Sequence, residues 1–573
     1  MQYQSSKTDV LILGSGGAGL FAALHAKQAN PELEVTIAIK GLLGKCGCTR
    51  MVQGGYNVAL SPGDSVERHF MDTIIGGKWL PDQAMAMRLC RTAVTRVQEL
   101  ENELGCFFDR NHDGSLHHKA FAGQTFDRTV HKGDLTGIEI ISRLMEQVRA
   151  LPINLLEEHR ALALVPSRDG AALTGVLMVD MRSGEFRLLR AKTVLLATGG
   201  GPTMYRYHTP SVDKSMDGLA MALQLGLGLR DMEMVQFHPT GLLAGIDTRM
   251  TGTVLEEGLR GAGGHLLDGA GERFMQNYDS AAERATRDIV SRAIYAEMRA
   301  GRTTPNGGVY IAMGHLGAAE VARKFPGMVK RCADCGFDLA GGRVEVVPTA
   351  HYLMGGVVVD ADSRGSLPGL FVAGEDAGGA HGANRLGGNG VANSTVFGGI
   401  AGDEMAVEAA AQSHWNDPDM GRVEACIEDS LLPFRCKAGD INAIRERLLD
   451  LMWESVGVLR DSAGLTEAQT ELAQLRLELS QTGIGGDNRV FNLSWHDWLN
   501  LRSLIEVSEV IAAAALAREN SRGAHYREDF PQVGSLEQSY FTIAGRRNDK
   551  VWVERAPVEF SIVQPGESLI END

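Results

Sequence analysis

The sequence predicts an α/β protein, and three stretches of the chain carry this prediction. An apolar run at residues 9–13 leads into the glycine-rich segment 14–19, an alanine-rich helical segment follows, and a second strand is expected at 35–39. A strand, a GxGxxG turn, a helix and a strand within about 30 residues are typical of a Rossmann-like domain. Buried strands that end in glycines recur at 191–200 and 369–376. We expect both of them to return to the first sheet.

The glycine-rich turn is the predicted phosphate-binding element. Glycines let the backbone approach a pyrophosphate closely, and the free N–H groups of the following helix attract it. The candidate ligand-binding residues are Gly14, Ser15, Gly16, Gly17, Ala18 and Gly19. A simple NAD site has an acid at the end of the second strand, where this chain has Lys40. The ribose contact or the cofactor therefore differs from the NAD pattern.

A loop rich in glycine and cysteine follows the second strand, at residues 42–60. Small residues directly after a dinucleotide-binding turn indicate where a flavin ring can lie. Cys46 and Cys48 are interpreted here as small buried side chains. The alternative is a redox-active dithiol, although two cysteines one residue apart rarely form a disulfide, because it would be strained.

We expect four parts in this chain of 573 residues, which is too long for one core. The nucleotide-binding pattern is interrupted between residues 243 and 350, and this interruption predicts an inserted α+β capping domain. The nucleotide-binding domain then comprises residues 1–242 and 351–415. A helical domain at 416–535 and a small C-terminal domain at 536–573 complete the chain.

Hydrophobic periodicity predicts the main elements of each part. In the nucleotide-binding domain we expect helices at 81–107, 134–150, 217–225 and 396–412. A small antiparallel meander is expected there from strands at 161–166, 173–180 and 185–189. The clearest helices of the helical domain are at 441–459 and 495–518.

The composition excludes several classes of function. A net charge of −16 and a pI near 5.5 argue against nucleic acid or an anionic membrane surface as the main partner. The polar start of the chain is not typical of a signal peptide, and without a run of about 18 apolar residues we expect no direct membrane insertion. Eight cysteines without a disulfide framework favour a reducing, cytoplasmic location. The lone CxxC at 332–335 has no second pair nearby, so no metal site is predicted.

Two further glycine-rich segments contain the most informative charged side chains. They are TAHYLMGG at 349–356 and GANRLGGN at 382–389. The glycines allow a ligand to come close to His351 and Arg385. A fixed cation beside a histidine suits a small carboxylate substrate. The alternative is that both segments are ordinary glycine-rich turns.

Ten motifs in one order span nearly the whole chain. They are GSGGAGL at 14–20, QGG at 53–55, ATGG at 197–200, QFHPTG at 236–241, EEGLRGAGG at 256–264, TRD at 286–288, PTAHYLMGG at 348–356, GED at 374–376, HGANRLGGN at 381–389 and SRGAHYREDFP at 521–531. By these motifs the chain resembles the flavoprotein subunits of succinate dehydrogenase and fumarate reductase and, more distantly, L-aspartate oxidase. The order makes the resemblance specific, because no lone motif would decide it.

The resemblance implies FAD as the cofactor and hydride transfer between flavin N5 and the carbon of a dicarboxylate such as fumarate. Matched position by position, the substrate carboxylates would be held by His238, His351 and Arg385. The implied FAD-binding residues beyond the first turn are Lys40, Cys48, Thr49, Gln53, Gly54, Gly55, Ala197, Thr198, Gly199, Asp217, Glu375, Asn389 and Val391. Glu375 would contact the ribose.

The proton-transfer residues are implied by the same resemblance. Arg287, from the cap, would donate the proton in reduction or accept it in oxidation, and Glu257 and Arg260 would relay it. Phe121 would press on the substrate. Two carboxylates need fixed cations and donors that polarise the double bond before the hydride arrives. An arginine is an unusual general acid, so its carboxylate neighbour matters.

The chain departs from the family pattern at several positions. The family attaches its flavin through the histidine of an R-S-H-T motif, and Cys48 stands at that position. We therefore expect noncovalent FAD that favours reduction, with a cysteinyl link as the remaining option. Glu256 replaces a family threonine and would repel a dicarboxylate unless it is protonated or turned away. Ala262 replaces a family glutamate, and Phe121 stands where aspartate oxidases have a glutamate, so an amino-group site is not supported.

The leading hypothesis is thus an FAD-dependent oxidoreductase of the fumarate reductase and succinate dehydrogenase type. Electrons would be exchanged with an iron–sulfur subunit or another carrier, since the chain has no haem or cluster motif of its own. Such a partner could associate the protein with a membrane. The alternatives are a flavoprotein reductase or oxidase for a different carboxylic acid, a flavin and disulfide redox protein that uses Cys46 and Cys48, and a non-catalytic flavoprotein scaffold.

Overall fold

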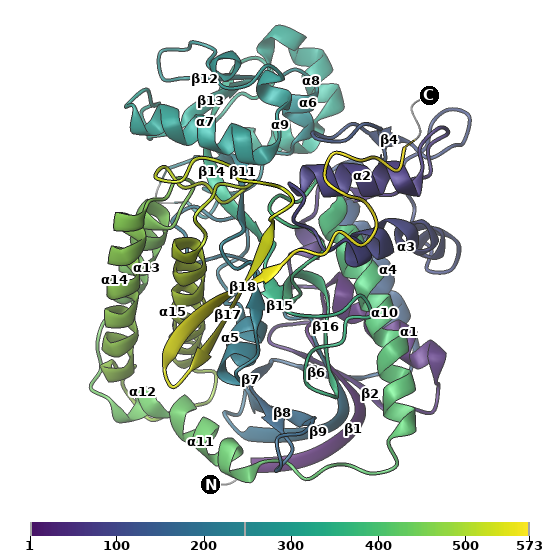
Figure 1. The fold of residues 1–573 in the computed structure, drawn as a ribbon, viewed down its shortest axis with the longest axis vertical. Coiled ribbons are helices and arrows are strands. Elements are labelled where there is room, and N and C mark those ends of the chain that lie inside the picture. Colours follow the sequence, from purple (N-terminus) through teal and green to yellow (C-terminus); the bar gives the residue numbers. More distant parts are fainter. Residues whose placement is uncertain (1–2, 246–247, 571–573) are drawn as a thin grey trace.

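A large mixed sheet forms the base of the molecule in the computed structural model, which describes residues 3–245 and 248–570 (Figure 1). The order of its strands is β6-β2-β1-β9-β8-β7, and β16 also pairs with β9. Their bounds are β1 Tyr3–Leu13, β2 Val35–Ile39, β6 Asn154–Glu157, β7 His159–Pro166, β8 Leu173–Asp180, β9 Phe186–Leu196 and β16 Leu370–Val372. β6, β2, β1, β9 and β16 pair in parallel, whereas β8 pairs antiparallel with both β9 and β7. This is the predicted α/β class.

Two strands differ from the expected pattern. The predicted third strand of the meander and the predicted return strand are one continuous strand, β9, which pairs with β8 on one side and with β1 on the other. No glycine or proline separates the two halves, so the chain has no reason to turn. β1 begins at Tyr3 rather than at Asp9, because the backbone of its first residues pairs with β9. These residues are polar and largely exposed, so no apolar run marks them in the sequence.

The helices of this part are α1 Gly17–Ala29, α2 Val66–Gly76, α3 Gln83–Asn102, α4 Thr136–Ala150, α5 Asp217–Gln224 and α10 Asn389–Ala411. α1 and α10 pack against the parallel strands and α5 against β7, whereas α4 packs on α1, α3 on α10 and α2 on α3. α10 starts seven residues before its predicted start at 396, directly after Gly388, whose φ is +86°. α2 was not predicted; its signal is Ser65, whose side chain caps the helix by accepting from the Arg68 N–H.

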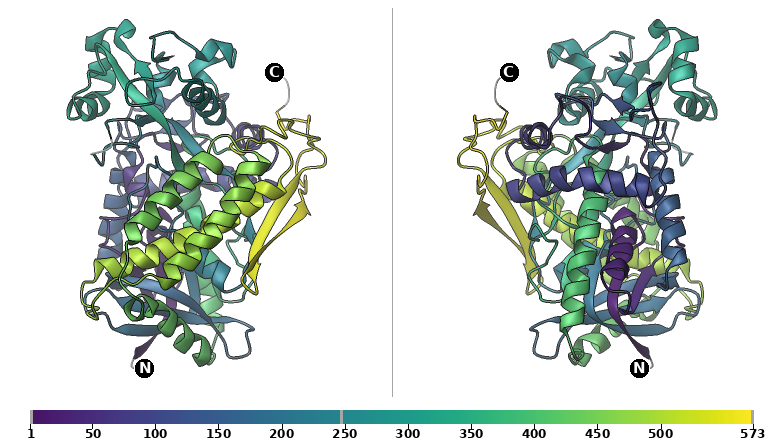
Figure 2. Two further views of the ribbon diagram at one scale, coloured as in Figure 1. Left: turned by 90° about the vertical axis from the view of Figure 1, so that its left-hand side faces the viewer. Right: turned by 90° about the vertical axis from the view of Figure 1, so that its right-hand side faces the viewer.

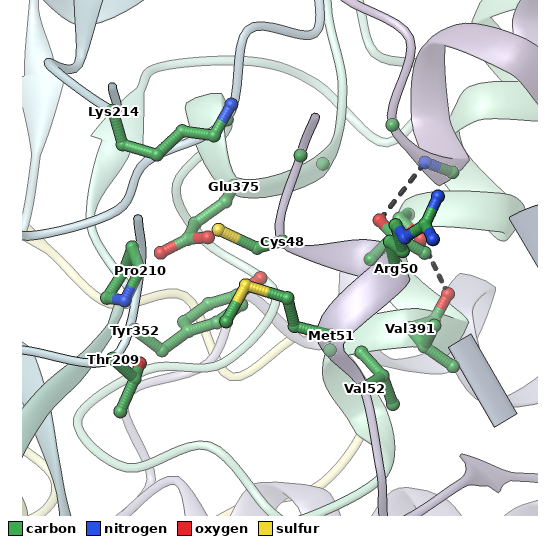
Figure 3. A pocket seen from close by; sticks show the side chains of 18 of the residues that line it. Cys48, Arg50, Met51, Val52, Thr209, Pro210, Lys214, Tyr352, Glu375 and Val391 are labelled. Carbon is green, nitrogen blue, oxygen red and sulfur yellow. Dashed lines mark hydrogen bonds between the residues drawn. The ribbon is translucent and has the colours of Figure 1, made fainter. Parts of the chain in front are cut away.

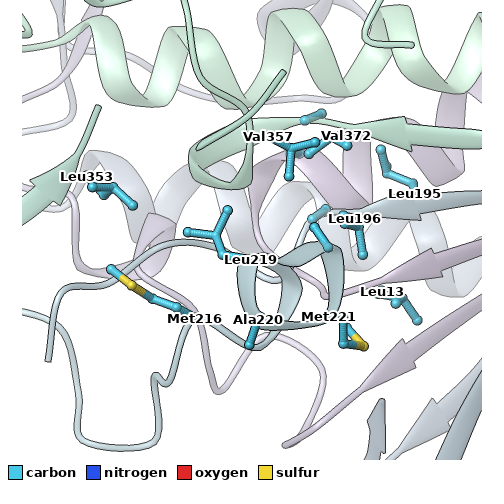
Figure 4. Packing of buried hydrophobic residues seen from close by; sticks show 14 of the residues in the cluster. Leu13, Leu195, Leu196, Met216, Leu219, Ala220, Met221, Leu353, Val357 and Val372 are labelled. Carbon is cyan, nitrogen blue, oxygen red and sulfur yellow. The ribbon is translucent and has the colours of Figure 1, made fainter. Parts of the chain in front are cut away.

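Close packing places the cofactor turn on the sheet. α1 lies against α10, and a Cβ on Gly398 would lie only 2.5 Å from the Ala18 carbonyl oxygen. The apolar side chains of β1, β9, β16 and α5 form one buried cluster, which includes Leu13, Leu196 and Leu219 (Figure 4). The carboxyl ends of these parallel strands therefore meet at one rigid edge, where ligands bind in open α/β sheets.

The cap stands on top of this domain and has a core of its own (Figure 1). Its sheet has the order β11-β14-β13-β12. The strands are β11 Val235–Leu242, β12 His265–Leu267, β13 Val309–Ala312 and β14 Arg343–Leu353, and the helices are α6 Gly258–Gly261, α7 Arg287–Arg299, α8 Ala318–Lys324 and α9 Pro326–Ala333. β11 and β14 are the two connections to the FAD-binding domain, and β14 runs across the predicted boundary at residues 350 and 351.

The helical part and the C-terminal hairpin lie along the side of the sheet (Figure 2). They comprise α11 Met420–Ser430, α12 Leu432–Arg435, α13 Ile441–Ser455, α14 Ser462–Gln481, α15 Leu493–Ala517, β17 Tyr540–Arg547 and β18 Lys550–Pro557. β17 joins the short strands β10 Leu229–Arg230 and β15 Gly356–Val357 in a small sheet. No helix of the described residues is long and apolar enough to cross a membrane.

The motif at residues 521–531 contributes to a network of buried arginines at the end of α15. The Arg527 guanidinium donates to the carbonyls of Ala515 and Leu516 at the end of α15. Arg518, fully buried beside this motif, forms ion pairs with Asp231 and Glu233 in the turn between β10 and β11. The network fixes the helical part to the base of the cap.

Candidate active site

A cavity of about 490 Å³ runs from the carboxyl edge of the large sheet to the underside of the cap. Most of the predicted ligand-binding residues line it. Those from the predicted cofactor set are Gly14, Ser15, Gly16, Gly17, Ala18, Lys40, Cys48, Thr49, Gln53, Gly54, Gly55, Ala197, Thr198, Gly199, Asp217, Glu375 and Val391. Those from the predicted catalytic set are Phe121, His238, Glu257, Arg287, His351 and Arg385. The fold thus brings both sets into one space.

Three predicted residues lie outside the lining of this cavity. Gly19 allows helix α1 to contact the strand before it, because a Cβ there would lie 2.1 Å from the Gly14 carbonyl oxygen. Asn389 uses its amide inside the protein, where Oδ1 accepts from Asn57 at 2.8 Å. Arg260 borders a second, smaller cavity of about 90 Å³.

The phosphate-binding turn has the geometry that a dinucleotide requires. Gly14 has a φ of +109°, and a Cβ would lie 2.2 Å from the Ala197 carbonyl oxygen, so only glycine fits there. The N–H of Gly17, at the start of α1, donates to the Thr49 hydroxyl at 3.1 Å. This bond holds the 42–60 loop over the helix N-terminus, where an anionic group is stabilised by the helix dipole.

At the far end of the cavity Lys40 forms a buried polar cluster. Its ammonium donates to Asp217, Ser215 and Asn500, each at 2.9 Å. Burial lowers the pKa of Lys40 to about 8, and Asp217 opposes this shift. Burial also opposes ionisation of Asp217, but Arg160 and Lys40 hold its pKa far below the usual value. The cluster offers a fixed, polar wall to the nucleoside end of a cofactor.

Glu375 is a half-buried carboxylate that forms no ion pair with another described residue. Its Oε1 accepts from the N–H groups of Leu353 at 2.9 Å and Gly201 at 3.2 Å. Burial raises its pKa to about 7. A carboxyl of this kind gains from a hydroxyl partner. A ribose hydroxyl of FAD fits that requirement.

The Cys48 thiol lies beside the Glu375 carboxylate, and Lys214 extends toward the same part of the pocket (Figure 3). Burial and Glu375 raise the pKa of Cys48 to about 12. The side chain is therefore a thiol at neutral pH, and a thiol is a poor nucleophile. Cys46 and Cys48 are both free. Lys214 lies in a stretch without any predicted motif, so sequence reasoning missed it.

Under the cap, Arg287 and Glu257 form a close ion pair. The Glu257 carboxylate accepts from Nε of Arg287 at 2.9 Å and from its NH2 at 2.6 Å. Gln236 joins this pair to Arg385, because its Oε1 accepts from Arg287 and from Arg385, both at 3.1 Å. Gln236 was not assigned a role, although it belongs to the motif QFHPTG.

Arg385 is the cation in this group that has no carboxylate partner among the described residues. Its guanidinium stacks 4.4 Å over the Tyr352 ring, and its buried Nε has no hydrogen-bond acceptor within the described parts of the chain. Burial, together with the charge of Arg287, lowers its pKa to about 10, so it stays charged at neutral pH. An unpaired donor on a buried cation is costly unless a ligand accepts from it.

Two neutral histidines complete the substrate end. The rings of His238 and His351 lie 5.4 Å apart, and burial together with Arg287 lowers the pKa of both well below the usual value. Nδ1 of His238 accepts from the Thr240 N–H at 3.3 Å, which places its proton on Nε2. Nδ1 of His351 bonds to the Thr209 hydroxyl at 2.9 Å. Both are suited to donate a hydrogen bond rather than to carry charge.

Phe121 separates the main cavity from the smaller one, since its ring lines both. A Cβ on Gly54 or on Gly387 would lie 2.6 Å from the ring, so these glycines make room for it. Behind Phe121, Arg260 lies 3.7 Å from Glu257 and is 1% exposed. Burial lowers the pKa of Arg260. Glu257 is thus hydrogen-bonded to Arg287 and lies within ion-pair distance of Arg260, without a direct hydrogen bond to Arg260 among the described residues.

The cap adds a further arginine that sequence reasoning missed. Arg331, on α9, lines the cavity and donates to the Val254 carbonyl at 3.0 Å. The Gln53 carboxamide oxygen accepts from its NH2 at 3.2 Å when the amide is oriented to satisfy both groups. No group of three or more potential metal ligands occurs in the described parts of the chain.

The glycine-rich turn, the Glu375 carboxyl and the Arg287–Glu257 pair of the cap thus meet at one cavity, an arrangement that suits a flavin-dependent oxidoreductase. The FAD binding domain family matches residues 9–391, and the fumarate reductase flavoprotein C-terminal family matches residues 445–569. The chain belongs to the family of fumarate reductase and succinate dehydrogenase flavoprotein subunits, as its motifs predicted. FAD is the cofactor of this family.

Several known proteins are similar to this chain over nearly its full length. The chain is 37% identical to an uncharacterised FAD-dependent oxidoreductase of Methanocaldococcus jannaschii, over 97% of this chain and 99% of that protein. It is 39% identical to a subunit of the CoM/CoB fumarate reductase of Methanothermobacter marburgensis, over 93% and 96%. The structure of an Escherichia coli quinol fumarate reductase flavoprotein superposes with a TM-score of 0.93 at 32% identity, covering 98% of this chain and 99% of that one.

Proposed function

We propose that the protein reduces the carbon–carbon double bond of a fumarate-like carboxylic acid, using noncovalently bound FAD. The observation that carries this proposal is Arg385, a buried and charged guanidinium with no carboxylate of its own among the described residues, beside two neutral histidines. One substrate carboxylate accepting from Arg385 and His351 satisfies these donors. Such preorganised donors also polarise the double bond of the acid.

FAD supplies the hydride, and the residues of the cap supply the proton. Arg287 holds its guanidinium against Glu257 and faces the same cavity as Arg385. An arginine that gives up a proton needs a neighbouring group that returns it. The Glu257 carboxylate is hydrogen-bonded to Arg287 and lies 3.7 Å from Arg260, so it is placed to pass a proton from Arg260 to Arg287. We assign Arg287 as the proton donor on this basis.

The protonation state of Cys48 supports noncovalent FAD. Covalent attachment requires a nucleophile, and the histidine used for it in the family is replaced by a half-buried thiol with a raised pKa. The same property weighs against a redox-active dithiol of Cys46 and Cys48, since disulfide exchange needs a thiolate. Without the covalent bond we expect a lower flavin potential, which favours reduction of the acid.

Electrons reach the flavin from a separate iron–sulfur subunit or another carrier in this proposal. Three apolar side chains that line the cavity also reach the protein surface near the flavin loop. They are Met51, Leu135 and Ile138, which are 49%, 52% and 39% exposed. An exposed apolar rim of this kind is typical of a docking surface.

The test is anaerobic reoxidation of the dithionite-reduced holoenzyme by fumarate and related unsaturated acids. We expect the wild-type flavin to reoxidise, and Arg385→Gln to lower kcat/KM by about 10² or more through loss of a charge-assisted contact. Ferricyanide, which needs no acid site, should oxidise both reduced proteins equally. If Arg385→Gln reduces the acids as fast as the wild type does, the assignment is wrong.

A further inference from the structure

Glu256 lines the cavity directly beside Glu257, but no arginine of the described residues forms an ion pair with it. Its Oε2 lies 3.8 Å from Nζ of Lys119, and its side chain is 6% exposed. Lys119 belongs to β4, His118–Lys119, in the FAD-binding domain, so the pair crosses the boundary between this domain and the cap. Of the two adjacent carboxylates, Glu257 is thus neutralised by Arg287 through two short bonds to one oxygen, and Glu256 by a single longer contact with Lys119.

The charged groups around Glu256 come from three elements. Lys119 faces it from β4, Asp134 from the loop before α4, and Arg331 from α9. Burial raises the pKa of Glu256, Asp134 adds to the rise, and Lys119 and Arg331 offset it. Two cations and two carboxylates leave no net positive charge on this wall.

The opposite wall differs in its charge. Arg287 donates to Glu257, Arg260 lies 3.7 Å from it, and Arg385 lines the cavity nearby, so three cations surround one carboxylate and the histidines are neutral. A substrate carboxylate is therefore matched by positive charge on the Arg385 side, and none is matched on the Glu256 side. In a small dicarboxylate, the carboxylate on the Arg385 side therefore meets positive charge, whereas the carboxylate on the Glu256 side does not.

We infer that the acid reduced here carries one carboxylate, at Arg385, and an uncharged hydrogen-bond donor such as an amide or hydroxyl at the other end, facing Glu256. The inference rests on the proposed function and names the substrate class of the same site. A donor group gains a charge-assisted hydrogen bond from Glu256, whereas a second carboxylate is repelled by it. Glu256 is then the residue that determines specificity for the second substituent.

The experiment compares kcat/KM for three acids with the FAD-loaded protein: fumarate, its monoamide fumaramate, and crotonate, which has a methyl group at that end. We expect the wild type to prefer fumaramate to both others by about tenfold or more. Glu256→Thr removes the carboxylate and should abolish or invert the preference over fumarate. Glu272→Thr, at an exposed position of the cap, is the matched control and should leave the preference unchanged.

The pH dependence gives an independent measurement. Protonation of Glu256 removes its charge, so fumarate turnover relative to crotonate should rise as the pH falls in the wild type and in Glu272→Thr. The rise should be absent in Glu256→Thr and in the isosteric Glu256→Gln. FAD content measured for each variant shows that the site is folded.

The outcomes separate this inference from the proposed function. If fumarate is preferred by the wild type, or if the preference is the same after Glu256→Thr, Glu256 does not set specificity and the inference is overturned. If fumaramate and crotonate react equally, there is no donor contact, which also overturns it. If none of the acids reoxidises the flavin although ferricyanide does, the proposed function itself fails.

Discussion

Replacing Glu257 by glutamine changes one charge at the centre of the site and keeps the shape of the side chain. Glu257 is the carboxylate partner of Arg287 through bonds of 2.9 and 2.6 Å, and it lies 3.7 Å from Arg260. In Glu257→Gln these two arginines and Arg385 remain buried without that carboxylate. Breaking a buried pair by removing one partner costs about 3–5 kcal/mol of stability.

The catalytic consequence of Glu257→Gln is larger for the step that needs a proton. An amide does not relay a proton between Arg260 and Arg287, and the loss of a positioned acid–base group costs roughly 10²–10⁴ in rate. We therefore expect reoxidation of the reduced flavin by an unsaturated acid to slow by that factor. Oxidation by ferricyanide transfers only electrons and should stay within about twofold of the wild type.

The assay is anaerobic stopped-flow at the flavin absorbance band, with the acid or ferricyanide as the oxidant. Glu272→Gln is the control, since it removes one carboxylate from an exposed position of the cap. A Glu257→Gln variant that binds FAD and reduces the acid at more than half of the wild-type rate would refute the relay. Equal slowing with ferricyanide would show damage to the flavin site instead.

Four further predictions test other parts of the structure. Acid denaturation followed by filtration should release all the FAD into the filtrate; flavin that stays on the protein would identify a covalent link and contradict the noncovalent proposal. Cys48→His should raise the flavin midpoint potential in a redox titration if it restores a link; an unchanged potential in a variant with covalent flavin would contradict the proposed effect of the bond. Gly14→Ala should abolish FAD binding in a fluorescence titration, because its Cβ would meet the Ala197 carbonyl; tight binding would mean that the turn is not the phosphate site. His238 and His351 are held neutral when folded, so unfolding free energy should fall as the pH drops below about 6.5, by up to about 1.4 kcal/mol per pH unit for each, and the double glutamine variant should lose that part of the slope in denaturant titrations.

Local signals in the sequence were sufficient for the cofactor turn. The GxGxxG spacing predicts strand, turn and helix because only glycine tolerates the φ of Gly14 and its contact with Ala197. The start of α10 was misplaced, because the glycines before it suggested a loop and the buried network around Asn389 is formed by residues distant in the sequence. Similarly, β9 appeared as two strands because along one edge its first half pairs with β8 and its second half with β16, while β1 pairs with its whole length.

The sequence predicted the site residues that stand in motifs and were expected to contact the substrate or carry its proton. It did not predict the residues that contribute by bonding to other side chains of the site. Arg287, Glu257 and Arg385 stand in motifs, and the fold brings them together. Gln236, which joins the two arginines, stands in a motif but gave no sign of its bonding partners. Contacts between domains, such as Lys119 with Glu256, have no local signal because they depend on how the cap meets the FAD-binding domain.

The most direct test of the central claim is a single turnover with product analysis. The FAD-loaded protein is reduced under anaerobic conditions, freed of excess reductant, and mixed with fumarate or fumaramate. Our account predicts flavin reoxidation together with one equivalent of the saturated acid per FAD, quantified by NMR. A flavin that stays reduced with both acids, or that reoxidises without forming a saturated product, would contradict the account.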